Sequence, residues 1–165
     1  MDEIRKAAEE FLSHDRIAVA GVSRSGDSAA NPVYRRLRKE GYDVFAVNPA
    51  ATEVEGDPCW PSLAEVPAEL DGVIIATHPD VSDDVARECV EIGVPRVWFH
   101  RSFGTGSVSD EAVRVCREAG ISVLAGACPM MFLEPVDVVH RCMRWVLDRT
   151  GGLPEPVNFS AHEER

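Results

Sequence analysis

Short apolar runs alternate along this chain with stretches whose apolar residues recur at helical spacing. Each apolar run is four to six residues long, and a run of that length between polar turns is typical of a strand buried on both faces. The stretches around the runs repeat apolar residues at i, i+3, i+4 and i+7, which predicts amphipathic helices. Strands are expected over residues 17–20, 43–47, 72–77, 96–100 and 121–124, and helices over 3–13, 31–41, 62–66, 80–93, 109–120 and 135–149.

Alternating strands and helices indicate a parallel sheet that is covered by helices on both faces. Since crossover connections are right-handed, the sequence predicts an α/β, doubly wound sheet of about five parallel strands. Residues 1–150 are expected to form one domain, and residues 151–165 a flexible or partner-draped C-terminal tail. Asn31 and Pro32 are expected to begin the second helix, as N-cap and first helical residue. Such sheets bind ligands at the carboxyl ends of their strands, where the strand order reverses.

Composition narrows the classes of partner. The 165 residues carry a formal net charge of −11, and this field repels nucleic acid and anionic membranes. The acidic N-terminus lacks a secretory h-region and no apolar run is long enough to span a bilayer, so we expect a cytoplasmic protein. The five cysteines form no C-x-x-C pair, and we therefore predict no metal site.

The turn after the first strand carries the most informative motif. Gly21, Ser23 and Gly26 have the spacing of a phosphate-binding G-x-G-x-x-G turn, with serine in the middle position. Gly21 permits a tight turn, and Ser23 offers a hydroxyl and a backbone N–H. Arg24 adds a donor for a charge-assisted hydrogen bond. This position directly after a strand favours a phosphate-bearing ligand over a plain connecting turn.

A nicotinamide cofactor is disfavoured by the end of the second strand. An NAD site needs an acidic residue there to hold the ribose, and this chain has Val47, Asn48 and Pro49. An NADP site would need a nearby arginine, and the following residues 50–52 supply none. The ligand is therefore expected to be another phosphate-bearing molecule.

Two other functions remain open from the residues alone. One is an enzyme that uses His78, His100 and Arg101, which follow the third and fourth predicted strands. The other is a redox or interaction protein built on Cys128, which lies just past the fifth strand, and on the C-terminal region. Spacing alone pairs none of these side chains into a catalytic set, and the plain interpretation of each is a lining or packing residue.

Several segments of the chain resemble a known family. The segments RIAVAGVS (16–23), GYDVFAVNP (41–49), PSLAEVP (61–67) and Cys128-Pro129 are similar to those of small stand-alone CoA-binding domain proteins. These proteins in turn resemble the N-terminal domain of the succinyl-CoA synthetase α subunit. The resemblance covers about residues 15–135 and implies a Rossmann-like fold that binds coenzyme A or an acyl-CoA. One departure is Ala50-Ala51, where a basic residue often follows the Asn-Pro pair.

The resemblance also implies roles for individual residues. The glycine turn would hold the CoA phosphates, Asn48-Pro49 would border the adenosine, and the segment after the third strand would line the pantetheine channel. The phosphohistidine of the synthetase lies in a later domain that this chain lacks, so we expect binding without catalysis. Oligomeric state is left open, a homodimer included. The expected ligand-binding residues are Gly21, Val22, Ser23, Arg24, Val47, Asn48, Pro49, Thr77, His78, Pro79 and Cys128.

Overall fold

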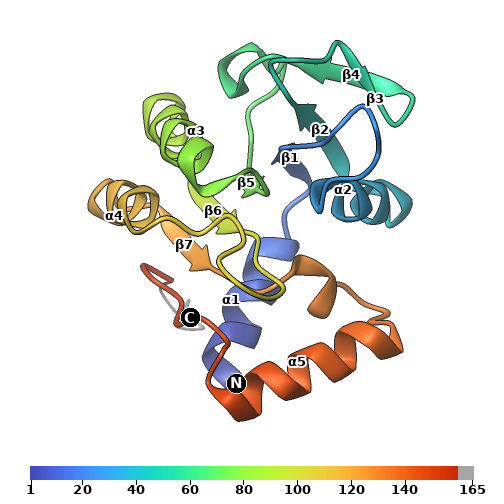
Figure 1. The fold of residues 1–165 in the computed structure, drawn as a ribbon. Coiled ribbons are helices and arrows are strands. Elements are labelled where there is room, and N and C mark those ends of the chain that lie inside the picture. Colours follow the sequence, from blue (N-terminus) through green and yellow to red (C-terminus); the bar gives the residue numbers. More distant parts are fainter. Residues whose placement is uncertain (160–165) are drawn as a thin grey trace.

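The computed structural model describes residues 1–159 and alternates strands with helices, as the pattern predicts (Figure 1). Most observed boundaries fall within two residues of the expected ones. The strands are β1 (Arg16–Ala20), β2 (Asp43–Val47), β3 (Glu53–Val54), β4 (Asp57–Trp60), β5 (Gly72–Ile75), β6 (Arg96–Phe99) and β7 (Ser122–Ala125). The helices are α1 (Asp2–Leu12), α2 (Ala30–Lys39), α3 (Pro79–Ile92), α4 (Asp110–Glu118) and α5 (Val138–Thr150), with 3-10 turns η1 (Leu63–Glu65) and η2 (Pro129–Met131).

The strands form one sheet in the order β3-β4-β2-β1-β5-β6-β7. All pairs are parallel except β3 with β4, so the predicted doubly wound α/β sheet is confirmed. The chain moves from β1 to β2 on one side and then to β5 on the other side of β1. The strand order therefore reverses between β1 and β5, at the centre of the sheet.

The sheet has seven strands in place of the expected five, because the β3–β4 hairpin widens one edge. Its register pairs Val54 with Asp57, which leaves Glu55 and Gly56 as a two-residue turn. Both turn residues have positive φ angles, 52° and 79°, as a type I′ turn requires. The hairpin escaped sequence prediction because Glu-Gly is not a usual signal for this turn and Pro58 stands within β4.

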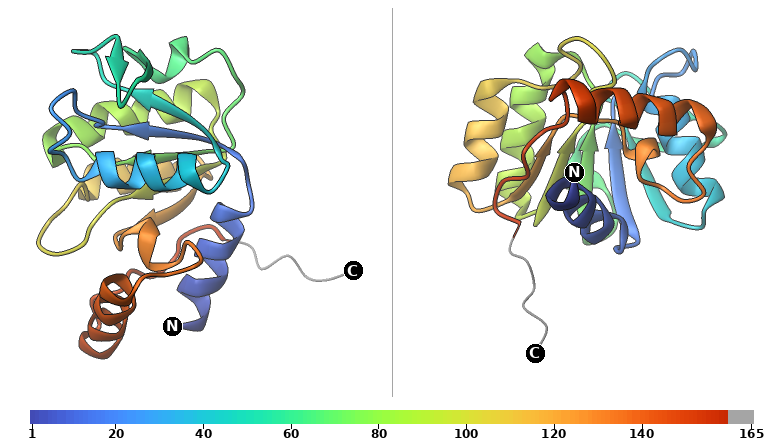
Figure 2. Two further views of the ribbon diagram at one scale, coloured as in Figure 1. Left: turned by 90° about the vertical axis from the view of Figure 1, so that its right-hand side faces the viewer. Right: turned by 90° about the horizontal axis from the view of Figure 1, so that it is seen from below.

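Helices cover both faces of the sheet (Figure 2). One face packs α1, α2 and η2 against side chains such as Ile17, Val19 and Trp98. The opposite face packs α3, α4 and η1 against Ala18, Ala20 and Ile75. Neighbouring residues of β1 thus point to opposite cores, which explains why this strand is apolar along almost its whole length.

Trp98 is the largest fully buried side chain on the α1 side. Its ring meets the edge of Phe11 with centroids 5.4 Å apart, and it also contacts Phe132. The indole Nε1–H donates a hydrogen bond of 2.9 Å to the carbonyl of Gly126, so burial leaves no polar atom of the ring without a partner. Trp98 therefore fixes α1 and the segment after β7 to the same face.

The start of α2 differs from the prediction. The helix begins at Ala30 and its N-cap is Ala29, so Asn31 lies inside the first turn and is not the cap. Asn31 is completely buried, and its side chain bonds to the glycine turn after β1. An asparagine whose amide has partners in another segment no longer has to cap its own helix, which accounts for the shifted start.

The last helix and the segment after it also differ from expectation. Helical spacing predicts Val139, Met143 and Leu147 on one apolar face of the last helix. In the structure Met143 and Leu147 pack against the core, while Val139 is 65% exposed. Beyond α5, Val157 pairs with Val123 of β7. The expected tail therefore docks on the sheet edge up to residue 159, and residues 160–165 lie outside the described part. None of the helices within residues 1–159 is long and apolar enough to cross a membrane.

Candidate functional site

A cleft of about 570 Å³ opens at the carboxyl ends of β1, β2 and β5. It lies at the reversal of strand order, where doubly wound sheets bind their ligands. Its floor comes from the strand ends, and α3 and the segment before η1 form its walls. The lining residues are Ala20, Gly21, Ser28, Val47, Asn48, Pro49, Pro61, Leu63, Ala76, Thr77, His78, Val81, Asp84, Val85 and Glu88.

Gly21 lies directly against the backbone of the segment that follows β5. Its φ angle is +102°, a conformation that favours glycine. A Cβ atom at this position would lie 2.5 Å from the carbonyl oxygen of Ala76, which is a backbone overlap. The tight turn predicted at Gly21 is therefore present, and a residue with a side chain would force β1 and β5 apart.

The buried side chain of Asn31 holds the glycine turn after β1 through hydrogen bonds. Its Oδ1 accepts a hydrogen bond of 2.9 Å from the Ser23 backbone N–H and one of 2.8 Å from the Ser28 hydroxyl. Its Nδ2 donates to the Ser23 carbonyl and to the Glu55 carboxylate at 2.9 and 2.7 Å. One buried amide thus joins the turn, the start of α2 and the β3–β4 hairpin.

The hydroxyl groups of the turn are engaged by a carboxylate of the same turn. Ser23 and Ser25 both donate to Asp27, and these hydrogen bonds, that from Ser25 first, hold the pKa of Asp27 below its usual value. Asp27 therefore carries a negative charge at neutral pH, beside the atoms expected to meet a phosphate. Arg24, which is exposed on the same turn, is the cation available there.

Asn48 holds the end of β2 against the turn. Its Nδ2 donates to the carbonyl of Val22 at 2.9 Å, and its Oδ1 accepts from the backbone N–H of Ala50 at 2.8 Å. Both ends of the amide are thereby used within the protein. Asn48 shapes the wall on which Pro49 stands, and this explains why an asparagine occupies a place where dinucleotide sites carry an acid.

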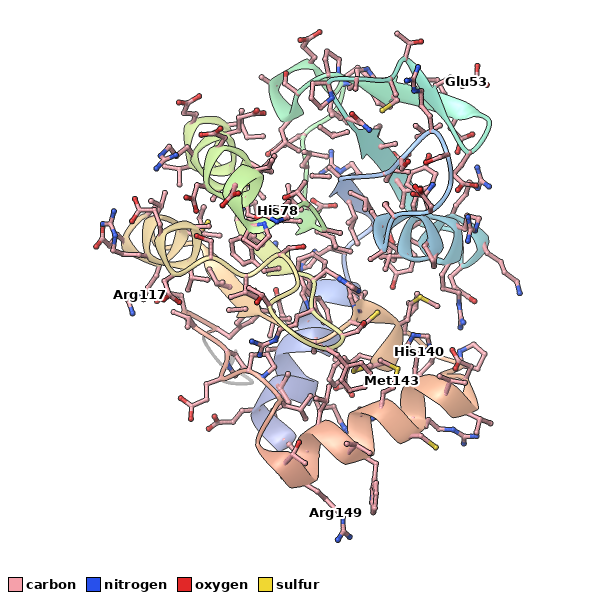
Figure 3. The ribbon with its side chains drawn as sticks, in the orientation of Figure 1. Glu53, His78, Arg117, His140, Met143 and Arg149 are labelled. Carbon is pink, nitrogen blue, oxygen red and sulfur yellow. The ribbon has the colours of Figure 1, made fainter. Side chains whose placement is uncertain are left out.

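The segment after β5 turns directly into α3. His78 is the N-cap of this helix, with its Nδ1 facing the backbone N–H of Asp80 at 3.4 Å, and Pro79 is the first helical residue. The Thr77 hydroxyl lies 2.9 Å from that of Ser82. Figure 3 labels His78 at this edge of the sheet, far from His140 on α5. Thr77 and His78 therefore border the cleft together.

The wall formed by α3 was missed by sequence analysis. Val81 and Val85 supply its apolar part, and Val81 is 48% exposed for lack of a covering element. Asp84 and Glu88 supply two carboxylates from the same helix face. The signal that could have found them is their i, i+3, i+4 and i+7 spacing from Val81, which places all four on one side of a helix.

The expected ligand-binding residues fall into three groups. Gly21, Val47, Asn48, Thr77 and His78 line the cleft together with Pro49. Val22 and Pro79 are direct chain neighbours of these residues, and Ser23 and Arg24 lie two and three residues after Gly21, but none of these four residues lines the cleft. Cys128 is the exception, because it is 3% exposed and packs in the core on the α1 side of the sheet.

Cys128 and two further candidate residues, His100 and Arg101, are held by contacts within the protein. Burial raises the pKa of the Cys128 thiol to about 11, so the nucleophilic thiolate is scarce at neutral pH. His100 is 7% exposed, and burial lowers the pKa of its ring and keeps it neutral. Arg101 points its guanidinium over Gly126, with a contact of 3.5 Å to the carbonyl of Gly152. The hydrogen bonds of these side chains therefore do not assemble them with His78 into one catalytic group.

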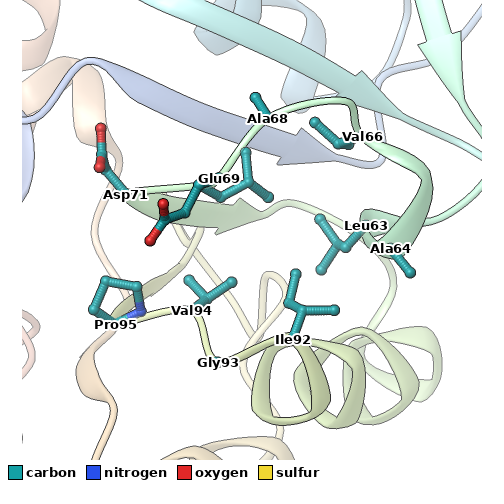
Figure 4. Close-up of a pocket in the computed structure, with 11 residues that line it drawn as sticks. Leu63, Ala64, Val66, Ala68, Glu69, Asp71, Ile92, Gly93, Val94 and Pro95 are labelled. Carbon is teal, nitrogen blue, oxygen red and sulfur yellow. The ribbon is translucent and has the colours of Figure 1, made fainter.

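A second cavity lies at the opposite edge of the sheet (Figure 4). It measures about 400 Å³ and is bounded by Leu63, Ile92 and the residues just before β5 and β6, including Asp71 and Pro95. Asp71 is already paired with Arg16 at 3.1 Å. This cavity lies at the amino ends of the strands, and Leu63 stands between it and the site at the strand-order reversal, because that side chain lines both. Within residues 1–159, no three His, Cys, Asp or Glu side chains are placed to hold a metal ion.

The family model described as "CoA binding domain" matches residues 15–134. The chain belongs to this family. A curated relative, the α subunit of ADP-forming acetate–CoA ligase II from Pyrococcus furiosus, is 30% identical over 109 residues, which are 66% of this chain and 24% of the relative. ADP-forming acetate–CoA ligase I from Archaeoglobus fulgidus is 33% identical over 73 residues, 44% of this chain and 11% of that protein. The chain thus spans a quarter or less of these relatives.

Solved structures agree with the family assignment. A hypothetical protein from Pyrococcus horikoshii OT3 superposes with a TM-score of 0.73 at 29% identity, over 80% of this chain and 91% of that one. A protein from Thermus thermophilus gives a TM-score of 0.64 at 25% identity, over 84% and 96% of the two chains. The Rossmann-like fold expected from the resemblance is therefore confirmed.

Proposed function

We propose that this protein binds coenzyme A or an acyl-CoA in the cleft at the strand-order reversal, without converting it chemically. The glycine turn with Arg24 faces the pyrophosphate, Pro49 borders the adenosine, and Thr77 and His78 border the pantetheine arm. The observation that carries the proposal is the position of the cleft, between β1 and β5 in a chain of the CoA-binding family.

The walls of the cleft support a ligand with a long uncharged arm. Val81 at the start of α3 gives an apolar surface on one side, and Ala20 and Ala76 form a narrow floor of small side chains. A pantetheine arm is a thin chain of two amides and methylene groups, and it suits such a groove. The binding role without chemistry is supported by His100 and Cys128, whose burial removes the two strongest candidates for a base and a nucleophile.

Coenzyme A is expected to raise the melting temperature of the protein by several degrees at a concentration about 100 times its dissociation constant. Binding to the folded state alone adds about 2.7 kcal/mol at that excess, and for a chain of 165 residues each kcal/mol is worth roughly 2–4 °C. The measurement is a thermal melt with and without millimolar CoA, repeated with acetyl-CoA.

The Arg24→Ala and Arg117→Ala variants form a matched pair for this melt. Both remove one exposed arginine, but Arg117 lies in the last turn of α4, away from the cleft. The shift caused by CoA should shrink in the first variant and stay as in the unaltered protein in the second. A melt that CoA leaves unchanged in every form of the protein would sink the proposed function, and steady release of free CoA from acetyl-CoA would argue for an enzyme.

The Asp27→Asn variant is expected to bind CoA several-fold more tightly. The charged carboxylate of Asp27 takes the hydrogen bonds of Ser23 and Ser25 and repels an incoming phosphate, whereas an amide keeps an acceptor oxygen without the charge. Isothermal titration calorimetry measures the change, with Asp110→Asn at the exposed start of α4 as control for the altered net charge. Weaker binding by Asp27→Asn would show that Asp27 supports the ligand and does not oppose it.

A further inference from the structure

The adenosine end of the cleft is acidic. This end is assigned by the proposed function, on which the inference rests, and it lies between Pro49, Pro61 and the wall of α3. Asp84 and Glu88 project from that wall, and none of the described lining residues is a lysine or an arginine. The two carboxylates therefore set the charge that a ligand meets at this end.

The carboxylate of Glu88 is held in place. Its Oε2 accepts a hydrogen bond of 2.9 Å from the backbone N–H of Leu63, the residue that begins η1. The side chain thus ties α3 to the segment opposite, and it cannot swing away without breaking this contact. The negative charge of Glu88 is a fixed part of the wall.

The arginines closest to this end along the chain already have acidic partners. Arg87 lies 3.2 Å from Asp84 and 3.5 Å from Glu111, so two carboxylates share one guanidinium. Arg38, the arginine that precedes Pro49 most closely, contacts Asp57 at 2.6 Å, and Arg35 contacts Glu55 at 2.7 Å. Downstream of Asn48-Pro49 the chain continues with Ala50, an exposed side chain without charge. The arginines of this region thus already form ion pairs within the protein.

We infer that the cleft selects an adenosine diphosphate ester whose ribose 3′-hydroxyl is free, the coenzyme A form of which is 3′-dephospho-CoA. A 3′-phosphate carries a charge of about −1.5 to −2 at neutral pH. It would meet the carboxylate of Glu88, which is held by a backbone N–H, and beside it Arg87, whose guanidinium is already shared by Asp84 and Glu111. A free hydroxyl donates a hydrogen bond to a carboxylate, as ribose hydroxyls do in dinucleotide sites. The net charge of −11 acts in the same direction, because it penalises the more highly charged ligand.

Calorimetric titration of the whole protein with CoA and with 3′-dephospho-CoA tests the inference. The dephospho form should bind about tenfold more tightly at 50 mM KCl, and the ratio should fall toward one at 1 M KCl as salt screens the repulsion. Equal affinities at low salt, or tighter binding of CoA, overturn the inference and leave the proposed function standing. Failure of both ligands to bind overturns the proposed function itself, so the two failures are distinguishable.

Two variants locate the preference at this end of the cleft. Glu88→Gln keeps an acceptor for the Leu63 N–H but removes the charge, and it should reduce the preference for the dephospho form several-fold. Ala50→Lys supplies the missing cation at an exposed position, and it should reverse the preference toward CoA. A preference unchanged in both variants would overturn the assignment to these residues, with melting temperatures confirming that each variant is folded.

Discussion

Replacing Gly21 with alanine is expected to destabilise the protein by about 3 kcal/mol or more and to abolish binding of the cleft ligand. The added Cβ would lie 2.5 Å from the Ala76 carbonyl oxygen and 2.9 Å from its carbon, both backbone atoms that cannot move alone. In addition, the φ angle of +102° is unfavourable for any residue with a side chain. Relief requires β1 and β5 to separate, and the cleft lies between those two strand ends.

A matched control exists within the same chain. Gly41 has a φ angle of +92°, close to that of Gly21, but a Cβ atom there would meet nothing within 4 Å. Gly41→Ala therefore carries only the conformational cost, about 1–2 kcal/mol, at the start of β2 away from the cleft. The difference between the two variants in urea denaturation measures the backbone overlap. Equal losses of stability would show that the approach of β1 to β5 is not what requires glycine.

The predicted sheet depended on signals that are local and strong. Each run, such as residues 17–20 or 72–75, is apolar on both sides because helices cover both faces of the sheet. A continuous apolar run of this kind is easily told from the alternating pattern of a strand that is exposed on one face. The same local logic predicted the tight turn at Gly21, and it placed the start of α3 at residue 80, one residue after the observed start at Pro79. Elements stabilised by their own sequence are thus the ones that could be predicted.

The missed features all depend on contacts between distant segments. Asn31 has the residue type of an N-cap, but its amide is used by the turn eight residues earlier and by Glu55 in the hairpin. Cys128 follows β7 as the ligand-edge residues follow their strands, yet a positive φ angle of 63° at Ala127 precedes its burial in the core. Glu88 of α3 lines the cleft where the backbone N–H of Leu63, the first residue of η1, binds its carboxylate. Local sequence propensity does not predict contacts between segments that are far apart in the chain.

Asn31→Ala is expected to cost about 3 kcal/mol of stability and to weaken CoA binding at least tenfold. The substitution leaves the Ser23 N–H without its acceptor and removes the donor to the Ser23 carbonyl, both at a site where the side chain is completely buried. Each buried hydrogen bond lost with an unsatisfied partner costs about 1–3 kcal/mol, and water reaching the exposed part of the turn recovers a share of it. The glycine turn, on which the proposed contact with the pyrophosphate depends, then loses its observed geometry.

Asn158→Gly is the matched control for Asn31→Ala. The Asn158 amide donates to the carbonyls of Arg117 and Ile121 at 3.1 Å each, far from the cleft, and its φ angle of 58° suits glycine. This control should lose stability without losing affinity for CoA, as measured by urea denaturation and calorimetry. If Asn31→Ala loses stability but binds CoA as tightly as the unaltered protein, then the glycine turn does not hold the ligand. In that outcome the pyrophosphate must be bound elsewhere along the cleft.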